Sequence, residues 1–290
     1  KIGLVELPLA LMNPGELLLL PDPGYPDYLS GVSLGRVAYE TFPLTAENDF
    51  LPDLDAIPEE TARRAKFIYI NYPNNPTGAV ATKAFYEKLV AWAKTYEVGV
   101  VSDLAYGALG YQGYENPSFL STPGAKDVGI EFYTFSKTFN MAGWRLAFAA
   151  GNDQMIEALN LIQDHLFVGI FPALQEAGIA ALLDPKSEEA VAQLNATYDS
   201  RRDAFVQAAA KIGWQAFPSR GSFYAWMPVP EGYTSESFAD LLLEKVHVAV
   251  APGKGFGPAG DAYVRIGLLV EPERLVEAVD RIANLHLFNN

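Results

Sequence analysis

The segment YTFSKTFNMAGWRLAF, residues 133–148, places two cations, Lys137 and Arg145, among small and apolar residues. A buried cation costs free energy unless a partner or a ligand compensates its charge. The chain has only 21 Lys and Arg against 35 Asp and Glu, so basic residues gathered in one segment need a reason. We therefore expect these two side chains to serve a site.

Further polar side chains follow predicted strands, at the point where each strand ends. With the two cations, the set comprises Tyr25, Asn75, Asp103, Tyr106, Thr134, Ser136, Lys137 and Arg145. Because active-site residues of open α/β sheets lie beyond the carboxyl ends of the strands, these groups should crowd around one crevice. An amine with a carboxylate partner suits Schiff-base chemistry on a carbonyl cofactor. Pyridoxal phosphate needs such a Lys for its aldehyde and an acidic partner for its pyridine nitrogen, while an Arg and hydroxyls would serve its phosphate.

Strands alternating with helical stretches position these groups in the first part of the chain. Strands are expected at 16–23, 35–44, 65–73, 98–106, 130–136 and 145–151, and a helix at 82–97. The apolar runs FIYI and VGVV are typical of strands covered on both faces. The pattern predicts an α/β fold with a mainly parallel sheet sandwiched by helices.

The pattern changes near residue 185, so we predict a large domain at 1–185 and a smaller α+β domain at 186–290. In the smaller domain, helices are expected at 187–213, 235–246 and 271–288, two short strands around a glycine turn within 214–229, and strands at 248–253 and 262–269. The segment APGKGFGPAG, residues 251–260, precedes a strand and not a helix, so it does not fit a dinucleotide fingerprint. We expect a flexible loop there.

Composition excludes several kinds of site and partner. The absence of Cys excludes disulfides and thiolate metal sites, and the three His lack metal-ligand spacing. A net charge of −14 opposes binding to nucleic acid or to an anionic membrane. No apolar run reaches the roughly 18 residues of a membrane span. We expect a cytoplasmic protein that binds neither partner.

Four segments in this order resemble the hallmarks of the class I/II aminotransferases, pyridoxal-phosphate enzymes of the aspartate-aminotransferase fold (type I). They are YPNNPTG with Asn75, DLAY with Asp103 and Tyr106, SKTFNMAGWR with Lys137 and Arg145, and YVRIGL with Arg265. Each segment alone is weak, since NPTG is also an ordinary turn sequence. Their order and spacing match as well, and the resemblance covers essentially the whole chain.

The resemblance implies how the cofactor ring is held. Lys137 forms the Schiff base and later moves the proton between the substrate and the cofactor. Asp103 pairs with the pyridine nitrogen. Asn75 and Tyr106 hydrogen-bond the phenolic oxygen of the ring, and Tyr25 stacks on its face.

The resemblance also implies a phosphate site and a substrate site. Thr134, Ser136 and Arg145 hold the phosphate, with Ser136 the weaker candidate. Arg265 binds the carboxylate of the amino acid or 2-oxo acid, beside Asn75, and its place in the other domain lets substrate binding close the cleft. Family members act as homodimers, and the segment 164–178 suits either a buried interface helix or the core.

The chain departs from the family at its beginning. The segment KIGLVELPLALMNPGE resembles the first helix of the large domain, and Lys1 resembles the end of a phosphate loop. The resemblance therefore predicts further residues upstream, including the N-terminal part of the small domain, and impaired function without them.

Several alternatives remain open at this point. A carbon–sulfur lyase shares the cofactor and the fold, and a regulator could bind pyridoxal phosphate without catalysis. The amino donor is undecided among N-acetyl-diaminopimelate, aspartate and aromatic amino acids. Arg220 and Phe223, in the expected hairpin, are weak candidates for substrate specificity.

Overall fold

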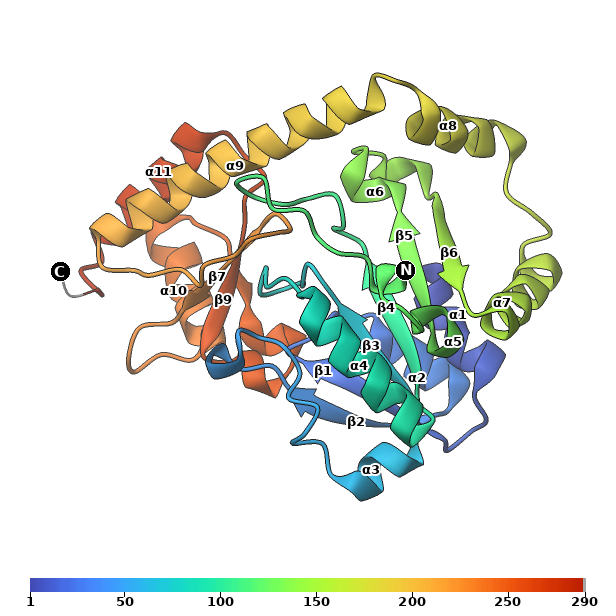
Figure 1. Ribbon diagram of the computed structural model, residues 1–290. Coiled ribbons are helices and arrows are strands. Elements are labelled where there is room, and N and C mark those ends of the chain that lie inside the picture. Colours follow the sequence, from blue (N-terminus) through green and yellow to red (C-terminus); the bar gives the residue numbers. More distant parts are fainter. Residues whose placement is uncertain (289–290) are drawn as a thin grey trace.

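The computed structural model describes residues 1–288, which form two β-sheets with helices packed around them (Figure 1). The larger sheet has the strand order β2-β1-β3-β4-β5-β6. Its strands are β1 (Leu17–Asp22), β2 (Ala38–Pro43), β3 (Ala65–Asn71), β4 (Gly99–Leu104), β5 (Gly129–Thr134) and β6 (Ala147–Gly151). All neighbouring strands are parallel except β5 and β6, which are antiparallel. The predicted mainly parallel sheet is confirmed.

Helices cover both faces of this sheet because the central strands are apolar on both sides. Leu19, Ile70 and Val100 belong to the buried cluster on one face, whereas Leu18 and Tyr69 belong to the cluster on the other. The first face carries α3 (Glu59–Arg64), α4 (Lys83–Tyr96) and α5 (Ala125–Val128), and the second carries α1 (Ile2–Leu11), α2 (Tyr28–Gly35) and α7 (Asp153–Leu166).

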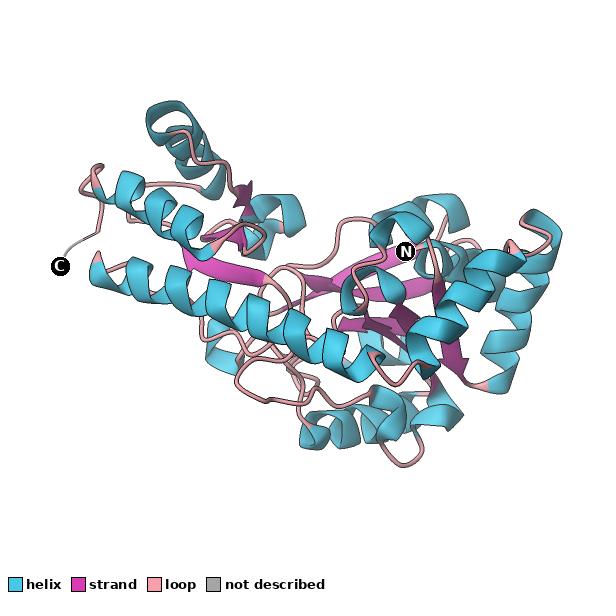
Figure 2. Cartoon of the chain, turned by 90° about the horizontal axis from the view of Figure 1, so that it is seen from above, coloured by secondary structure: helices cyan, strands magenta, loops and turns pink. Residues whose placement is uncertain are grey.

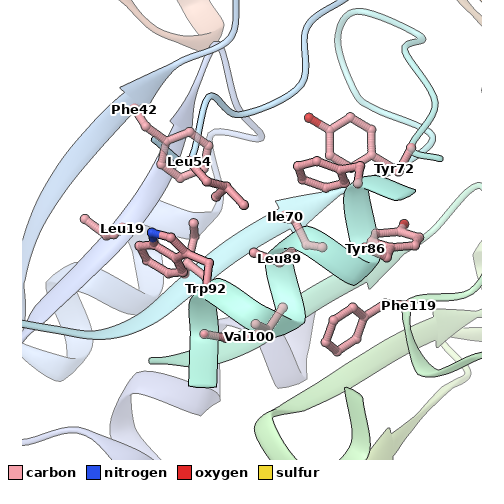
Figure 3. Packing of buried hydrophobic residues seen from close by; sticks show 14 of the residues in the cluster. Leu19, Phe42, Leu54, Ile70, Tyr72, Tyr86, Leu89, Trp92, Val100 and Phe119 are labelled. Carbon is pink, nitrogen blue, oxygen red and sulfur yellow. The ribbon is translucent and has the colours of Figure 1, made fainter. Parts of the chain in front are cut away.

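Helix α4 illustrates how local sequence fixes an element. The Thr82 hydroxyl caps its start by accepting a hydrogen bond from the Phe85 backbone N–H at 3.1 Å. The helix ends at Tyr96, and the next residue, Glu97, caps it with a left-handed φ of 58°. Leu89 and Trp92 point from α4 toward the apolar side chains of the sheet (Figure 3).

The second sheet is antiparallel, with the strand order β7-β9-β8. Its strands are β7 (Tyr224–Pro228), β8 (Ala251–Pro252) and β9 (Tyr263–Gly267), and its helices are α9 (Ser187–Lys211), α10 (Ser235–Val246) and α11 (Pro272–Ala283). They share a buried cluster drawn from residues 205–282. Helix α9 runs from α8 (Pro172–Leu183) across the molecule to α11 (Figures 1 and 2). The domain division at residue 185 stays a prediction.

The structure differs from the sequence prediction in the connecting segments. The segment 214–229 contains one strand, β7, where two were expected. Before β7, the Phe217 backbone N–H donates one hydrogen bond to the Trp226 carbonyl at 3.1 Å. The strand expected at 248–253 is reduced to β8. The loop expected to be flexible contains two 3₁₀ turns, η4 (Gly253–Phe256) and η5 (Pro258–Gly260).

The remaining elements are short. They are η1 (Ala46–Asn48), η2 (Phe119–Ser121), α6 (Phe135–Thr138) and η3 (Ala142–Trp144). The segment 164–178 divides between the end of α7 and the start of α8, and Val168 and Phe171 in it are 87% and 68% exposed. It is therefore not core in this chain. Within residues 1–288, no helix is both long and apolar enough to cross a membrane.

Candidate functional site

A cavity of about 760 Å³ lies at the carboxyl edge of the larger sheet and extends to β9. It is lined, among others, by all nine residues that the sequence analysis assigned to the cofactor or to the substrate carboxylate: Tyr25, Asn75, Asp103, Tyr106, Thr134, Ser136, Lys137, Arg145 and Arg265. Because β6 is antiparallel to β5, Arg145, which lies shortly before β6, lies at the same edge as Lys137, which follows β5. The strand-end argument thus predicts the place of the cavity, although it leaves the role of each side chain open.

Lys137 lies on α6, directly after β5, and is half-buried. Its Nζ atom is 5.2 Å from the centroid of the Phe223 ring. Burial lowers the pKa of the Lys137 ammonium, and the positive charges of Arg145 and Arg265 lower it further. A lysine with a lowered pKa has more of the neutral amine that can attack an aldehyde.

Asp103, near the end of β4, is one of two buried carboxylates that line the cavity, the other being Glu6 on α1. Burial raises the pKa of its carboxyl group, while a hydrogen bond from the Tyr28 hydroxyl to Oδ2, at 3.0 Å, opposes that change. The Tyr28 ring is held edge-on against Tyr25 and Tyr69. Asp103 can therefore stabilise a positive charge in the cavity.

Asn75 and Arg265 join the two sheets across the cavity. Nη1 of Arg265 donates a hydrogen bond to Oδ1 of Asn75 at 2.7 Å. The backbone N–H of Asn75 donates to Oδ1 of Asn71 at 2.8 Å, and Nδ2 of Asn71 donates to the Asp103 carbonyl at 2.7 Å. This chain of contacts fixes Arg265 relative to the end of β4.

The Arg265 guanidinium lies close to two aromatic rings. Its Cζ atom is 4.1 Å from the ring centroid of Tyr224 and 4.6 Å from that of Phe256. Cation–π contacts of this kind orient the guanidinium while leaving its N–H groups free to donate. The arrangement suits a carboxylate ligand.

Hydroxyl groups and a third cation gather beside α6. The Thr134 hydroxyl donates to the Ser136 hydroxyl at 3.0 Å and accepts from the Ser136 backbone N–H at 3.2 Å. Arg145 is exposed and has the left-handed φ of 54°. Its Nη1 atom donates to the Ala142 carbonyl at 2.8 Å. Together these groups could bind an anion such as a phosphate.

Two tyrosines complete the lining. Burial raises the pKa of Tyr106 well above its ordinary value, so its phenol stays protonated and can donate a hydrogen bond. Its hydroxyl lies 3.4 Å from that of Tyr224. Burial also raises the pKa of Tyr25 to about 12. Both rings therefore offer neutral phenols to a ligand.

The sequence analysis did not single out four residues that contribute to the site. They are Tyr28, Asn71, Tyr224 and Phe256. Asn71 ends β3, so the strand-end argument could have found it. Of the two weak hairpin candidates, Phe223 contacts Lys137, whereas the Arg220 guanidinium lies 5.8 Å from the centroid of the Tyr114 ring and Arg220 does not line the cavity. Within the described residues, no cluster of His, Asp and Glu could hold a metal ion.

Comparisons with known proteins show to which family the chain is similar. The family described as Aminotransferase class I and II matches residues 3–282. The L-glutamine–4-(methylsulfanyl)-2-oxobutanoate aminotransferase of Bacillus subtilis is 57% identical over 99% of this chain and 72% of its own length. The LL-diaminopimelate aminotransferase of Moorella thermoacetica is 48% identical over 97% of this chain and 72% of its own length.

The fold of this chain is also similar to that of a solved structure. The substrate-bound BacF structure from Bacillus subtilis superposes with a TM-score of 0.93, is 46% identical, and covers 99% of this chain and 72% of its own. The family match, the two relatives and the shared fold lead to one conclusion. The chain belongs to the class I and II aminotransferases, a family of pyridoxal-phosphate-dependent enzymes.

Proposed function

We propose that the cavity binds pyridoxal phosphate through the nine predicted residues and transfers an amino group from an amino acid to a 2-oxo acid. The observation that carries the proposal is that a half-buried amine, Lys137, and a buried carboxylate, Asp103, line the same cavity. The named relatives are aminotransferases, and neither their names nor the site favours a carbon–sulfur lyase or a regulator.

The side chains present fit this cofactor in number and chemistry. The volume of about 760 Å³ is within the usual range for a ligand pocket. Asp103 supplies a negative charge for a protonated ring nitrogen, and the Tyr25 ring supplies an aromatic face. The Asn75 amide oxygen is engaged by Arg265, so its amide nitrogen remains to donate to the ring oxygen, together with the Tyr106 hydroxyl. Thr134, Ser136 and Arg145 would hold the phosphate.

When bound, pyridoxal phosphate supplies an aldehyde for the amine and a ring that stabilises negative charge on the substrate's α-carbon. Lys137 is the group placed to attack the aldehyde and, as a neutral amine, to take and return the α-proton at its Nζ atom. Arg265 would bind the substrate carboxylate through two N–H groups and so fix the α-carbon near Lys137.

The cations of the cavity have assigned partners or tasks. The lining cations within residues 1–288 are Lys1, Lys137, Arg145 and Arg265. Lys1 pairs with Asp27 at 2.5 Å, and the other three are assigned to the cofactor and the α-carboxylate. We favour a 2-oxo acid with a neutral side chain over the aspartate pair because of the name of a relative. The 57% identical relative is named for such an acceptor, 4-(methylsulfanyl)-2-oxobutanoate.

A substrate panel tests this proposal with the 290-residue chain and pyridoxal phosphate. We expect methionine from glutamine and 4-(methylsulfanyl)-2-oxobutanoate, measured by chromatography. Glutamate from LL-diaminopimelate and 2-oxoglutarate would instead favour the second candidate, which the name of a 48% identical relative supports. Keto-acid-independent release of pyruvate from cystathionine would favour the lyase. Failure of every amino donor would contradict transamination by this chain.

We also propose that the active form is a homodimer. Exposed apolar side chains gather on α7, α8 and the segment between them: Leu161, Leu166, Phe167, Val168, Ile170, Phe171, Ile179, Leu182 and Leu183. A group of exposed apolar side chains on neighbouring elements is typical of a protein interface. Gly169 and Ile170 also line the cavity, so a second copy on this surface would lie at the rim of the site.

Light scattering after size-exclusion chromatography tests the dimer. We expect twice the chain mass for the unmodified protein and the chain mass for the double variant Val168→Asp, Phe171→Asp. The matched control is Leu34→Asp on α2, since Leu34 is also exposed, at 60%, but lies outside this surface. A monomeric unmodified protein would contradict the proposal. The cytoplasmic location of the protein stays a prediction, which cell fractionation can test.

A further inference from the structure

Tyr224 connects two residues to which different tasks are assigned. It is the first residue of β7, it is buried, and it lines the cavity. Its ring centroid lies 4.1 Å from Cζ of Arg265, and its hydroxyl lies 3.4 Å from the hydroxyl of Tyr106. One side chain therefore contacts both the guanidinium assigned to the substrate and the phenol assigned to the cofactor ring.

The backbone determines this double contact. In the β7–β9 pairing, Trp226 lies opposite Arg265. Tyr224 precedes Trp226 by two residues, so it is the diagonal neighbour of Arg265 on the same face of the sheet. The backbone N–H of Tyr224 also donates to the Ser222 hydroxyl at 3.2 Å. The second ring near the guanidinium belongs to Phe256, whose carbonyl accepts a hydrogen bond from the Gly24 N–H at 2.7 Å. Both aromatic neighbours of Arg265 are thus held by backbone contacts.

We propose that Tyr224 is a positioning residue with two separable parts: its ring orients Arg265 for the substrate carboxylate, and its hydroxyl orients and polarises Tyr106 toward the cofactor ring. The proposal rests on the proposed function, because it needs Arg265 and Tyr106 in those roles. It assigns a task to a residue that sequence patterns did not single out.

The hydroxyl part follows from counting donors. Tyr106 has one O–H hydrogen, and in its assigned role it donates that hydrogen to the phenolic oxygen of the cofactor. The Tyr224 hydroxyl is then the donor to the Tyr106 oxygen. A hydrogen bond received by Tyr106 strengthens the one that it donates, since successive hydrogen bonds polarise one another.

The ring part follows from electrostatics. The face of an aromatic ring attracts a cation, and such a contact is worth about 0.5–1 kcal/mol at exposed sites and more when water is excluded. Replacing Tyr224 by Phe keeps this contact and removes only the hydroxyl. Replacing it by Leu removes both parts. The two variants therefore separate the tasks.

The experiment uses the protein loaded with pyridoxal phosphate and two readouts other than turnover. The first is the pH midpoint of the absorbance change of the bound cofactor. The second is the Kd of 4-(methylsulfanyl)butanoate, a carboxylate without an oxo or amino group. The charged side chains that line the cavity with the Tyr106–Tyr224 pair are Lys1, Glu6, Asp103, Lys137, Arg145, Asp164 and Arg265, and the substitutions alter none of them.

For Tyr224→Phe we expect the midpoint to rise by roughly 0.4–1 pH unit, because the Tyr106 hydroxyl becomes a weaker donor to the phenolic oxygen of the cofactor. That oxygen then carries more negative charge and holds the proton next to it more strongly, so the proton is lost at a higher pH. The Kd of the carboxylate should stay within about 2-fold. For Tyr224→Leu we expect the same rise and a carboxylate Kd about 2- to 5-fold higher.

Tyr198→Phe is the matched control, because Tyr198 lies in the same buried aromatic cluster and its ring stacks on Phe223. Within the described residues its hydroxyl makes no hydrogen bond to Tyr106. This variant should leave both readouts unchanged. An unchanged midpoint in Tyr224→Phe would overturn the hydroxyl part, and an unchanged Kd in Tyr224→Leu would overturn the ring part.

The proposed function can fail separately from this inference. If the unmodified chain shows no cofactor absorbance, the proposed function is wrong and this inference falls with it. If the unmodified chain titrates normally and both Tyr224 variants behave like it, only the inference is wrong. Should Tyr224→Leu lose its cooperative thermal transition, Tyr224→Phe still decides the hydroxyl part, and Tyr224→Met, which also lacks an aromatic ring, replaces Tyr224→Leu as the test of the ring part with the same expected Kd.

Discussion

Removing the Tyr28 hydroxyl should move the acid limb of activity toward higher pH. In Tyr28→Phe, Asp103 loses the hydrogen bond that its Oδ2 accepts at 3.0 Å. That bond favours the ionised carboxylate, so it holds the pKa of Asp103 down against the opposing effect of burial. Without it the pKa must rise, and the carboxylate that would face the cofactor nitrogen protonates at a higher pH.

The size of the shift follows from the kind of bond. A hydrogen bond to a charged group contributes about 1.5–3 kcal/mol. Each pKa unit corresponds to about 1.4 kcal/mol, so the acid limb should move up by about 1–2 pH units. Both side chains are buried, at 2% exposure for Tyr28 and 8% for Asp103, so water cannot easily replace the missing donor.

The assay is the pH dependence of kcat/KM for the unmodified chain and for Tyr28→Phe. The control is Tyr69→Phe, because Tyr69 packs edge-on against Tyr28 but donates its hydrogen bond to the Leu4 carbonyl at 3.0 Å. This control should lose stability without moving the acid limb. An acid limb for Tyr28→Phe that coincides with that of the unmodified chain would refute the role assigned to the Tyr28–Asp103 pair.

Three further predictions concern packing, backbone and reactivity. Leu89→Ala should lower the free energy of unfolding by about 2–5 kcal/mol in urea titrations, because Leu89 is fully buried between α4 and the sheet. A loss below about 1 kcal/mol would mean that the site is loosely packed. Gly78→Ala should cost about 2 kcal/mol or more, since Gly78 has a φ of +72° and an added Cβ would lie 2.2 Å from the Ser219 hydroxyl oxygen. Equal stability to the unmodified chain would contradict that geometry. In competitive acylation of the cofactor-free protein at pH 8, Lys137 should carry a larger neutral fraction than a free lysine side chain in solution, because burial and nearby cations lower its pKa. A Lys137 labelling rate that rises with pH as steeply as that of a free lysine side chain up to pH 10 would count against the lowered pKa.

The location of the residues that follow the strands could be predicted from the sequence. Parallel strands run in one direction, so their carboxyl ends meet at one edge of the sheet. That rule places Tyr25, Asn75, Asp103 and Lys137 around one cavity without any knowledge of side-chain packing. The closeness of Arg145 needed one more fact, the antiparallel direction of β6, which periodicity does not reveal.

The residues that were missed act through contacts distant in sequence. Tyr28 lies on helix α2, 75 residues before Asp103 in the sequence, and no local pattern marks it. The turns at residues 253–260 were expected to be flexible, but the Ala259 N–H donates to Oδ1 of Asp22 at 3.0 Å. Such anchors depend on the assembled fold and are invisible in the segment itself.

The hairpin prediction failed for a similar reason. Pro218 has no N–H to extend a ladder from the Phe217–Trp226 bond. The Ser219 hydroxyl instead donates to the carbonyl of Gly78, and Gly221 forms a bridge with Gly110. The segment thus pairs with loops of the larger sheet, and this docking brings Phe223 to Lys137.

The most direct test of the proposed site is to reduce the pyridoxal-phosphate-loaded chain with borohydride and to map the modified peptide by mass spectrometry. The account predicts one stable pyridoxyl adduct, on Lys137, and its loss in Lys137→Ala. An adduct on a different lysine of the unmodified chain, or no adduct with the cofactor in excess, would contradict the assignment of Lys137 as the residue that binds the cofactor aldehyde.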